Sequence, residues 1–355
     1  MEASNLRTRR LGITDLRITV VGLGAWAIGG DRGAFGWGPQ DDDQSIAALR
    51  HGLELGINWI DTAAAYGLGH SEEVVGRLLR DLPANRRPYV FTKCGLISDP
   101  ANPNAPPQRN LRPESIRNEC DASLRRLGVD YIDLYQFHWP DDTGTPVEES
   151  WKTMVSLVEE GKVRAIGVSN FDVPLLERCE AIRHVDSLQP PLSLIHRDSA
   201  ETLIPWCDAH ETGVICYSPM QSGILTDGFS IERVARMAAN DWRRKNPEFE
   251  SPGLQRNIAL RDALKPIAQR HGVSVSEVAV AWVIAVPGVT AAIVGARSPE
   301  QVDGWIGAAN LELTDADLDE IAGAVAQTGA GHGPAIMSAP SRRQARDKRS
   351  TRATK

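Results

Sequence analysis

The sequence predicts an α/β protein that folds as a (β/α)8 TIM barrel, with an N-terminal β-hairpin and an extra helix at the C-terminal end. From Thr19 onward, short apolar stretches alternate with helical stretches eight times, at intervals of roughly 30–35 residues. The short stretches are almost wholly apolar, as strands buried on both faces of a parallel sheet must be. The chain has 355 residues, which suits one barrel. An open, doubly wound sheet is the alternative, but it normally contains fewer units.

The predicted strands are short apolar stretches bounded by glycine or polar residues. A hairpin precedes them over Arg9–Ile18, with polar residues at its tip. The first strand leads into a loop, 24–38, that is rich in glycine and tryptophan. In chain order the predicted strands are Thr19–Gly24, Ile57–Ile60, Tyr89–Thr92, Tyr131–Phe137, Val163–Val168, Ser187–Gln189, Val214–Tyr217 and Ala291–Val294.

The predicted helices have apolar residues at helical spacing, and several have recognisable ends. Gly56 and Gly128 are good helix stops, because glycine readily adopts the left-handed conformation that follows a last turn. Thr314 is a good helix start, with Asp317 at the third helical position. In chain order the predicted helices are Ser45–Leu55, Ser71–Leu79, Pro113–Leu127, Pro146–Glu159, Val173–Ile182, Ser199–His210, Leu254–Arg270, Ser274–Val286, Pro299–Ala309 and Thr314–Ala326.

One stretch, Val278–Ala296, has no charged residue and is almost long enough to cross a bilayer. Pro287 and Gly288 interrupt it, so a buried helix followed by a buried strand explains it better. The first ten residues are polar and basic, and no long apolar core follows them. We therefore expect neither a membrane span nor a signal peptide.

The charge is distributed unevenly along the chain. The net charge is −7, yet residues 339–355 hold seven Lys and Arg against one acid. The rest of the chain is therefore strongly acidic, which argues against nucleic acid as the main partner. We expect a barrel over residues 1–332 and a basic, disordered tail over 333–355. An arm that binds nucleic acid or an acidic surface is the alternative for the tail.

The five cysteines are scattered, with no spacing typical of metal ligands. We expect reduced thiols in a cytoplasmic protein. No pattern in the sequence distinguishes a monomer from a homo-oligomer.

Four polar side chains fall at or just after the ends of three consecutive predicted strands. Asp61 ends the second strand, Lys93 the third and His138 the fourth, and Tyr66 lies in the loop after the second. Carboxyl ends of parallel strands make the active face of a barrel, so the four should converge. Any one of them alone would be explained as a helix cap, a packing residue or a satisfied core histidine. Together they favour a catalytic site.

Such a group suits proton donation to a carbonyl oxygen that gains negative charge. Free tyrosine has a pKa of about 10, so we expect the Lys93 ammonium to lower the pKa of Tyr66. Asp61 would hold Lys93 in place, and a neutral His138 would orient the substrate oxygen. None of the four residues is a reductant, so a hydride donor must be bound.

A set of short motifs occurs in one order along residues 8–325. They are Gly22-Leu-Gly-Ala-Trp-Ala-Ile-Gly29, Asn58–Gly67, Thr92-Lys93, Gln136-Phe-His-Trp-Pro140, Gly167-Val-Ser-Asn-Phe171, Tyr217-Ser-Pro219 and Ile293-Val-Gly-Ala-Arg297. This ordered set resembles the aldo-keto reductase family. The segment Asp241–Phe249 looks most like the bacterial branch that acts on varied aldehydes and ketones.

The resemblance implies roles for individual residues. Asp61, Tyr66, Lys93 and His138 match the catalytic tetrad. The residues matching the nicotinamide and pyrophosphate sites are Gly24, Ala25, Trp26, Asp61, Ser169, Asn170, Gln189, Tyr217, Ser218, Pro219, Met220 and Ser222. The residues matching the adenosine site are Gly295, Ala296, Arg297 and Gln301. Arg297 would bind a 2′-phosphate, because a guanidinium suits phosphate oxygens, so NADPH is expected over NADH.

Two stretches depart from the family pattern. After Gln189 the family often has a tyrosine and then an asparagine, where this chain has 190–193, Pro-Pro-Leu-Ser. Near the adenine it commonly has Glu-Asn, where this chain has Gly304-Trp305. Trp305 would either stack on adenine or pack within its helix.

We expect Trp26, Trp37 and Trp139 to line the substrate pocket together with Tyr66 and His138. Aromatic walls suit a bulky, partly apolar ketone or a sugar-like ring. Trp37 would otherwise only cover the barrel edge. The polar segment 221–251 lies beside the implied cofactor groove, and we expect part of it to fold over the dinucleotide.

The sequence thus favours the reversible, NADPH-dependent reduction of an aldehyde or ketone, with hydride from nicotinamide and a proton from Tyr66. The resemblance extends to potassium-channel β subunits, so a cofactor-sensing partner subunit is the alternative. No His-x-His follows the first strand, which argues against a metal-dependent barrel hydrolase, and we expect no metal in the site. Apart from the cofactor, the expected partner is a small carbonyl compound.

Overall fold

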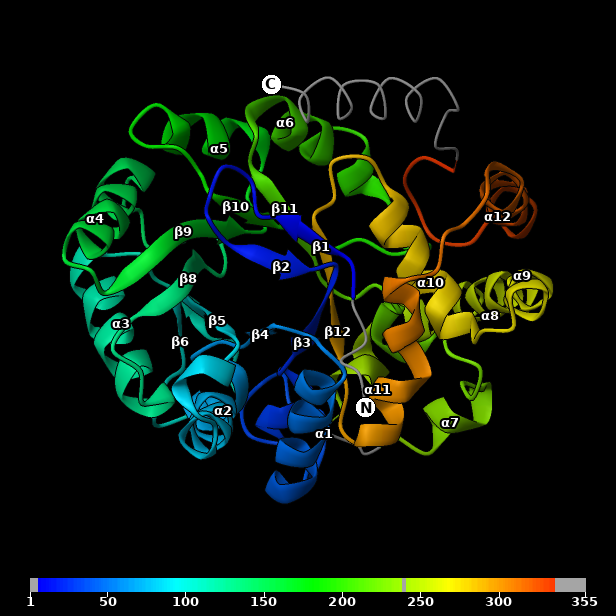
Figure 1. Ribbon diagram of the computed structural model, residues 1–355, viewed down its shortest axis with the longest axis horizontal. Coiled ribbons are helices and arrows are strands. Elements are labelled where there is room, and N and C mark those ends of the chain that lie inside the picture. Colours follow the sequence, from blue (N-terminus) through cyan, green and yellow to red (C-terminus); the bar gives the residue numbers. More distant parts are fainter. Residues whose placement is uncertain (1–5, 238–240, 336–355) are drawn as a thin grey trace.

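The structure of the protein is a computed structural model that describes residues 6–237 and 241–335. Within these residues eight strands form one closed barrel, and every neighbouring pair in it is parallel. The predicted (β/α)8 barrel is confirmed (Figure 1). The barrel strands are β3 (Val21–Gly24), β4 (Trp59–Asp61), β5 (Tyr89–Cys94), β8 (Ile132–Phe137), β9 (Val163–Ser169), β10 (Ser187–Gln189), β11 (Gly213–Cys216) and β12 (Ala291–Gly295).

Helices surround the barrel, as Figure 1 shows. They cover its apolar strands, which are buried almost throughout. The helices are α1 (Asp42–Glu54), α2 (His70–Asp81), α3 (Pro113–Leu127), α4 (Val147–Glu159), α5 (Val173–Glu180), α6 (Leu203–His210), α7 (Ile231–Ala235), α8 (Gly253–Ala263), α9 (Lys265–His271), α10 (Val275–Ala285), α11 (Pro299–Ile306) and α12 (Asp315–Thr328).

Three local predictions need correction. The helix predicted over 254–270 is two helices, α8 and α9, because Pro266 lacks the N–H that a continuous helix would use. Helix α6 begins at Leu203, after a short 3-10 turn over Asp198–Ala200. A two-stranded hairpin of β6 (Leu96–Ile97) and β7 (Gln108–Arg109) was not predicted, since each strand has only two residues.

The predicted helix ends that carry side-chain caps are confirmed. Thr314 and Asp317 form a reciprocal capping box at the start of α12, and Gly329 ends that helix in the left-handed conformation. The apolar run 278–296 is divided between α10 and β12, with Gly288 at a positive φ in the turn. Within the described residues, no helix combines the length and apolarity needed to cross a membrane. The basic tail was predicted over 333–355, but residues 333–335 are described and pack on the barrel, where the carbonyls of Gly333 and Pro334 accept from Arg197. Residues 336–355 lie outside the described part of the chain.

An N-terminal hairpin closes the end of the barrel where the strands begin. Its strands are β1 (Thr8–Arg10) and β2 (Arg17–Thr19), and Figure 1 shows it lying across the barrel. Leu11, Leu16 and Ile18 point inward and are fully buried. The active face must therefore lie at the opposite end, where the strands finish.

A glycine on β3 makes room for the largest ring in the barrel wall. Trp59 on β4 is fully buried, and its Nε1 donates to the Thr19 carbonyl at 2.9 Å. A Cβ on Gly22 would lie only 2.1 Å from the Trp59 ring. Phe91 packs against the other part of the indole, with ring centroids 5.1 Å apart. The interior here has no free volume for one more methyl group.

Gly22→Ala should therefore destabilise the protein by about 1–3 kcal/mol, because overpacking forces the Trp59 ring or the backbone to shift. The control is Gly323→Ala, at an exposed position inside α12 where a Cβ meets nothing within 4 Å. That change should be neutral or stabilising by about 0.5–1 kcal/mol. Denaturant unfolding measures both, and an unchanged midpoint for Gly22→Ala would contradict this account of the packing.

Candidate active site

Lys93 is the centre of the predicted catalytic group. Its Nζ lies 2.5 Å from Asp61 Oδ1, 2.9 Å from the Thr62 carbonyl and 3.2 Å from the Tyr66 hydroxyl. The ammonium therefore contacts the carboxylate and the phenol at once. The side chains of Lys93 and Asp61 are 0% and 3% exposed, so this ion pair is screened from water.

His138 completes the group on the other side of the phenol. The rings of Tyr66 and His138 meet edge to face, with centroids 5.5 Å apart. Asn170 Nδ2 donates to the His138 carbonyl at 2.9 Å and so fixes the backbone. The structure brings all four predicted residues together at the carboxyl ends of β4, β5 and β8.

Burial dominates the electrostatics of this group. It raises the pKa of Asp61 and lowers the pKa of Lys93, while their mutual attraction opposes both shifts. The pKa of Tyr66 is raised well above its ordinary value, first by burial and then by the Asp61 carboxylate. The expectation that Lys93 would lower the pKa of Tyr66 was therefore wrong for this structure. The phenol keeps its proton at neutral pH and is available as a donor.

The His138 imidazole is neutral at physiological pH. Burial, and then the positive charge of Lys93, hold its pKa well below the usual range. Its Nδ1 is buried and has no hydrogen-bond partner among the described residues, and neither has Gln136 Nε2 on the same strand end. Buried polar atoms without partners are costly, so this corner suits a polar ligand.

A second buried acid, Glu72, lies near Lys93 and stabilises its positive charge. Sequence reasoning missed this residue. Glu72 is fully buried, accepts from Thr92 Oγ1 at 2.6 Å and pairs with Arg126 Nε at 2.6 Å. Its negative charge favours the charged form of Lys93. In the sequence Glu72 looks like an ordinary acid in the first turn of a helix, where the helix dipole favours it.

The residues implied for the nicotinamide form one hydrogen-bonded network beside Asp61. Gln189 Nε2 donates to Asp61 Oδ2 at 2.9 Å, and Ser169 Oγ donates to the Gln189 carbonyl at 2.8 Å. The Tyr217 hydroxyl donates to Asn170 Oδ1 at 2.8 Å. The strand ends of β9, β10 and β11 thus present fixed amide and hydroxyl groups next to the catalytic group.

The stretch that departs from the family pattern after Gln189 continues the barrel by backbone pairing. Tyr217 N donates to the Pro190 carbonyl at 3.1 Å, and Leu192 N to the Tyr217 carbonyl at 3.2 Å. Pro191 and Tyr217 form a parallel bridge. Proline suits position 190 because only its carbonyl takes part in this pairing, so the missing N–H costs no hydrogen bond.

The loop after β11 holds a strained backbone. Ser218, Gln221 and Ser222 all have positive φ, at 56°, 45° and 52°. Asn170 has a φ of 60°. Non-glycine residues rarely adopt this conformation, and it concentrates at ligand-binding sites. Pro219 and Met220 lie within this loop, where the resemblance places the pyrophosphate.

Of the residues implied for adenosine, Arg297 is the most constrained. Its Nε donates to Gln40 Oε1 at 2.5 Å, and its Nη1 and Nη2 donate to the carbonyls of Trp37 and Pro39. Its backbone N–H donates to Gln301 Oε1 at 2.9 Å. Two of the five guanidinium N–H groups thus remain without an acceptor among the described residues.

The resemblance also implies an adenosine role for the residues beside Arg297. Gly295 and Ala296 precede Arg297 at the end of β12, and Gly295 pairs with Gly24. Trp305 lies on α11 and is 2% exposed. Of the two alternatives for this residue, packing in the protein interior is therefore the one that the structure shows, and stacking on adenine is not.

Ala25 and Trp26 directly follow β3, whose last residue, Gly24, pairs with Asp61. Ala25 N donates to the Asp61 carbonyl at 2.8 Å. Trp26 Nε1 donates to the Phe35 carbonyl at 3.2 Å, which fixes the Trp-rich loop.

Tryptophans pack beside Tyr66, but they are not the predicted set: Trp242 joins Trp26 and Trp37, and Trp139 packs on an arginine instead. Trp26 stacks near Tyr66, with centroids 6.0 Å apart, and meets Trp37 edge to face at 5.3 Å. Trp242 stacks on Trp26 at 5.3 Å and contacts Trp37 at 5.7 Å. Trp139 lies against Arg109 of β7, 4.4 Å from its guanidinium.

The segment that carries Trp242 is anchored to the loop after β11 by its neighbour Arg243. Arg243 pairs with Asp241, with Nη2 at 2.6 Å from Oδ2, and donates to the Ser222 carbonyl at 3.3 Å. Its guanidinium lies 4.7 Å from the centre of the Trp37 ring. Part of the polar segment 221–251 thus joins the loop after β11 to Trp26 and Trp37, a contact that no sequence pattern indicated.

Comparison with known proteins agrees with this geometry. The family model described as "Aldo/keto reductase family" matches residues 20–326. Aldo-keto reductase YhdN of Bacillus subtilis is 34% identical over 333 residues, 93% of this chain and 97% of that protein. The NADH-specific methylglyoxal reductase of Escherichia coli is 34% identical over 315 residues, 86% of this chain and 94% of that protein. The solved glycerol dehydrogenase AKR11B4 from Gluconobacter oxydans superposes with a TM-score of 0.81 at 36% identity, covering 95% of this chain and all of that one.

A buried, titratable acid lies just beyond the end of β5, the strand that carries Lys93. Glu119 on α3 accepts from Gly95 N through both carboxylate oxygens, at 3.2 and 3.0 Å. Burial raises the pKa of Glu119 to about 7. An unfolded glutamate has a pKa of about 4.3, so above that value the unfolded state gains more from ionisation than the folded state does.

Glu119 should therefore lower the free energy of unfolding as pH rises from about 4.5 to 7, by about 2–3 kcal/mol in total. Glu119→Gln removes this titration, so its stability relative to the wild type should increase from pH 5 to pH 8. Urea unfolding at both values measures the difference, whatever fixed cost the variant has. A pH-independent difference would show that Glu119 does not titrate in this range.

Proposed function

The chain belongs to the aldo/keto reductase family, and we propose that it reduces an aldehyde or ketone to the alcohol, reversibly, with NADP(H) as the cofactor. The observation that carries this proposal is the contact of Lys93 Nζ with the Tyr66 hydroxyl at 3.2 Å, beside a neutral His138. A protonated phenol, an ammonium ion and a neutral imidazole at one point suit an oxygen that becomes negative during reaction.

Tyr66 would donate the proton. Its raised pKa keeps the hydroxyl protonated at neutral pH, so the donor is fully loaded before the reaction. As the carbonyl oxygen gains charge it becomes a strong base, and the phenol proton moves to it. Lys93, held by Asp61, then stabilises the phenolate that remains. When bound, the nicotinamide ring of the cofactor supplies the hydride for the carbonyl carbon.

His138 would orient the carbonyl oxygen. Its neutral state leaves one ring N–H as a donor that does not compete as an acid with Tyr66. Ser169, Asn170 and Gln189 would hold the carboxamide of the nicotinamide, and the Tyr217 ring would lie against its face. Their mutual hydrogen bonds keep these groups in place before any ligand arrives.

The preference for NADP(H) rests on positive charge at the adenosine end. Burial lowers the pKa of Arg297, the positive charges of Arg243 and Arg233 lower it further, and the Asp241 carboxylate, which pairs with Arg243, opposes these shifts. Clustered guanidinium groups that repel one another gain from binding an anion such as a 2′-phosphate. The Escherichia coli relative is described as NADH-specific, so the preference proposed for this chain differs from the one in that description.

The substrate would be a bulky, partly apolar carbonyl compound or a sugar-like ring. Trp26 stacks near Tyr66, and Trp37 and Trp242 pack against Trp26, so a group of large flat rings lies beside the proton donor. Flat aromatic surfaces bind apolar groups and the faces of sugar rings. Trp139 would line the far edge of the same pocket. A reducing, cytoplasmic location fits the five cysteines, all of which are free and buried.

Tyr66→Phe should reduce turnover by about 10²–10⁴-fold while cofactor affinity stays unchanged, because only the proton donor is lost. Steady-state rates at the NADPH absorbance, together with quenching of tryptophan fluorescence by NADPH, measure the two properties. The control is Tyr131→Phe, which removes an exposed hydroxyl far from the barrel face. Full turnover in Tyr66→Phe would end this mechanism.

Arg297→Ala should raise the KM for NADPH by about 10–100-fold and change the KM for NADH little, because only NADPH carries the 2′-phosphate. Arg236→Ala, at an exposed arginine of the neighbouring segment, is the matched control. An equal rise for the two cofactors would mean that Arg297 only holds the loop of Trp37 and Pro39.

A further inference from the structure

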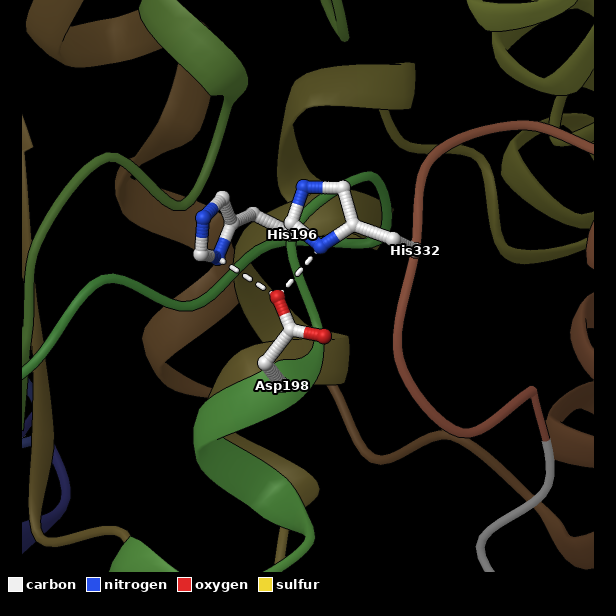
Figure 2. Close-up of side chains that lie close together, drawn as sticks. All are labelled: His196, Asp198 and His332. Carbon is white, nitrogen blue, oxygen red and sulfur yellow. Dashed lines mark hydrogen bonds and ion pairs between the residues drawn. The ribbon is translucent and has the colours of Figure 1, made fainter.

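Two histidines and an aspartate from distant parts of the chain meet on the rim of the barrel. His196 and Asp198 follow β10, and His332 follows α12 (Figure 2). Asp198 Oδ2 is hydrogen bonded to His332 Nδ1 and lies 3.7 Å from His196 Nδ1. The three ligand atoms all lie within 4.8 Å of one another. We propose that this cluster, the His196–Asp198–His332 cluster, binds one divalent transition metal ion of the zinc type.

The donor set and its spacing suit such an ion. Zinc takes imidazole nitrogen and carboxylate oxygen at about 2.0–2.2 Å, so tetrahedral ligands lie roughly 3.3 Å apart. His196 Nδ1 and Asp198 Oδ2 are already close to that separation. Asp198 and His332 must separate by about 1 Å, and their side chains, 50% and 48% exposed, are free to rotate that far.

The second imidazole distinguishes this cluster from ordinary histidine–aspartate pairs in the chain. His51 is hydrogen bonded to Asp303 at 2.6 Å, and His271 to Asp317 at 2.9 Å. Among the described residues, neither pair is joined by a second histidine. In the cluster the two rings meet edge to face at 4.3 Å. His196 Nδ1 is buried and has no hydrogen-bond partner among the described residues. A metal ion would satisfy this atom without adding a proton.

The surroundings favour a cation. Glu248 Oε1 lies 3.8 Å from His332 Nε2, the ring nitrogen opposite the one that faces Asp198. Histidines that bind metals commonly have a carboxylate beside their other ring nitrogen. At this distance Glu248 contributes negative charge and no hydrogen bond. Arg197 adds a positive charge nearby, but its guanidinium donates to the carbonyls of Leu194, Ala330, Gly333 and Pro334 and is directed at them.

The backbone holds both histidines in register. His332 N donates to the Ile195 carbonyl at 3.0 Å, and Arg197 N donates to the His332 carbonyl at 3.1 Å. Because the folded chain already positions the ligand atoms, little ordering remains when the ion binds. The ion would join the loop after Gln189 to the segment after α12, and so stabilise the folded state over the unfolded one.

The test is calorimetric titration of ZnCl2 into tag-free, EDTA-treated, full-length protein. The expected result is one ion per chain. His196→Gln and His332→Gln should each weaken binding by at least about tenfold, since even outer partners of ligands cost 10–100-fold. His51→Gln, which removes one histidine from a histidine–aspartate pair, should leave zinc affinity unchanged. No binding at millimolar zinc, or equal affinity in wild type and His332→Gln, would overturn the proposal.

A measurement on the wild type keeps the proposal testable if a variant fails to fold. X-ray absorption at the zinc edge should show two imidazoles with oxygen ligands and no sulfur. All five cysteines are buried, so sulfur ligation would mean that zinc binds unfolded chain, and it would overturn the site. A rise in melting temperature with zinc that is lost in His332→Gln would support it.

Discussion

The buried ion pair between Asp61 and Lys93 is the interaction on which the rest of the active face depends. Removing two charges from water costs several kcal/mol per ion, and apolar residues of similar size would often be as stable. The pair persists because each partner has further bonds: Lys93 donates to Thr62 and Tyr66, and Asp61 accepts from Gln189. Its position, beside a phenol at the end of the barrel, indicates that it serves chemistry more than stability.

Backbone strain lies on the same face. Five of the six described non-glycine residues with positive φ follow barrel strands or flank the catalytic loop: they are Leu68, Asn170, Ser218, Gln221 and Ser222. Such conformations cost of order 1–3 kcal/mol each and persist only where the surroundings enforce them. The hairpin at the opposite end buries Leu11, Leu16 and Ile18, and its one residue at positive φ is a glycine, Gly12. The barrel thus supplies stability at one end and tolerates strain at the other.

Several contacts join the loops of the active face to one another. Arg243 links Ser222 to Trp37, and Arg297 fixes the loop that contains Trp37 and Pro39. Ser193 Oγ donates to Gln221 Oε1 at 2.8 Å, which connects the loop after β10 to the loop after β11. A ligand that orders one of these loops would therefore act on the others, because the loops after β10 and β11 and the tryptophans form one connected unit.

The sequence by itself determined the barrel, its hairpin, most element boundaries and the convergence of four residues, Asp61, Tyr66, Lys93 and His138. It could do so because strand and helix periodicities are local, and because a parallel barrel places every strand end on one ring. It did not reveal Glu72 beneath Lys93, the stacking of Trp242 on Trp26, or the cluster that pairs Asp198 with His332. It also misjudged the pKa of Tyr66, because burial, which depends on the whole packed interior, outweighs a single neighbouring charge. Only the tertiary structure decided these features, since they are contacts between segments far apart in the chain, and no local pattern encodes which distant side chain arrives.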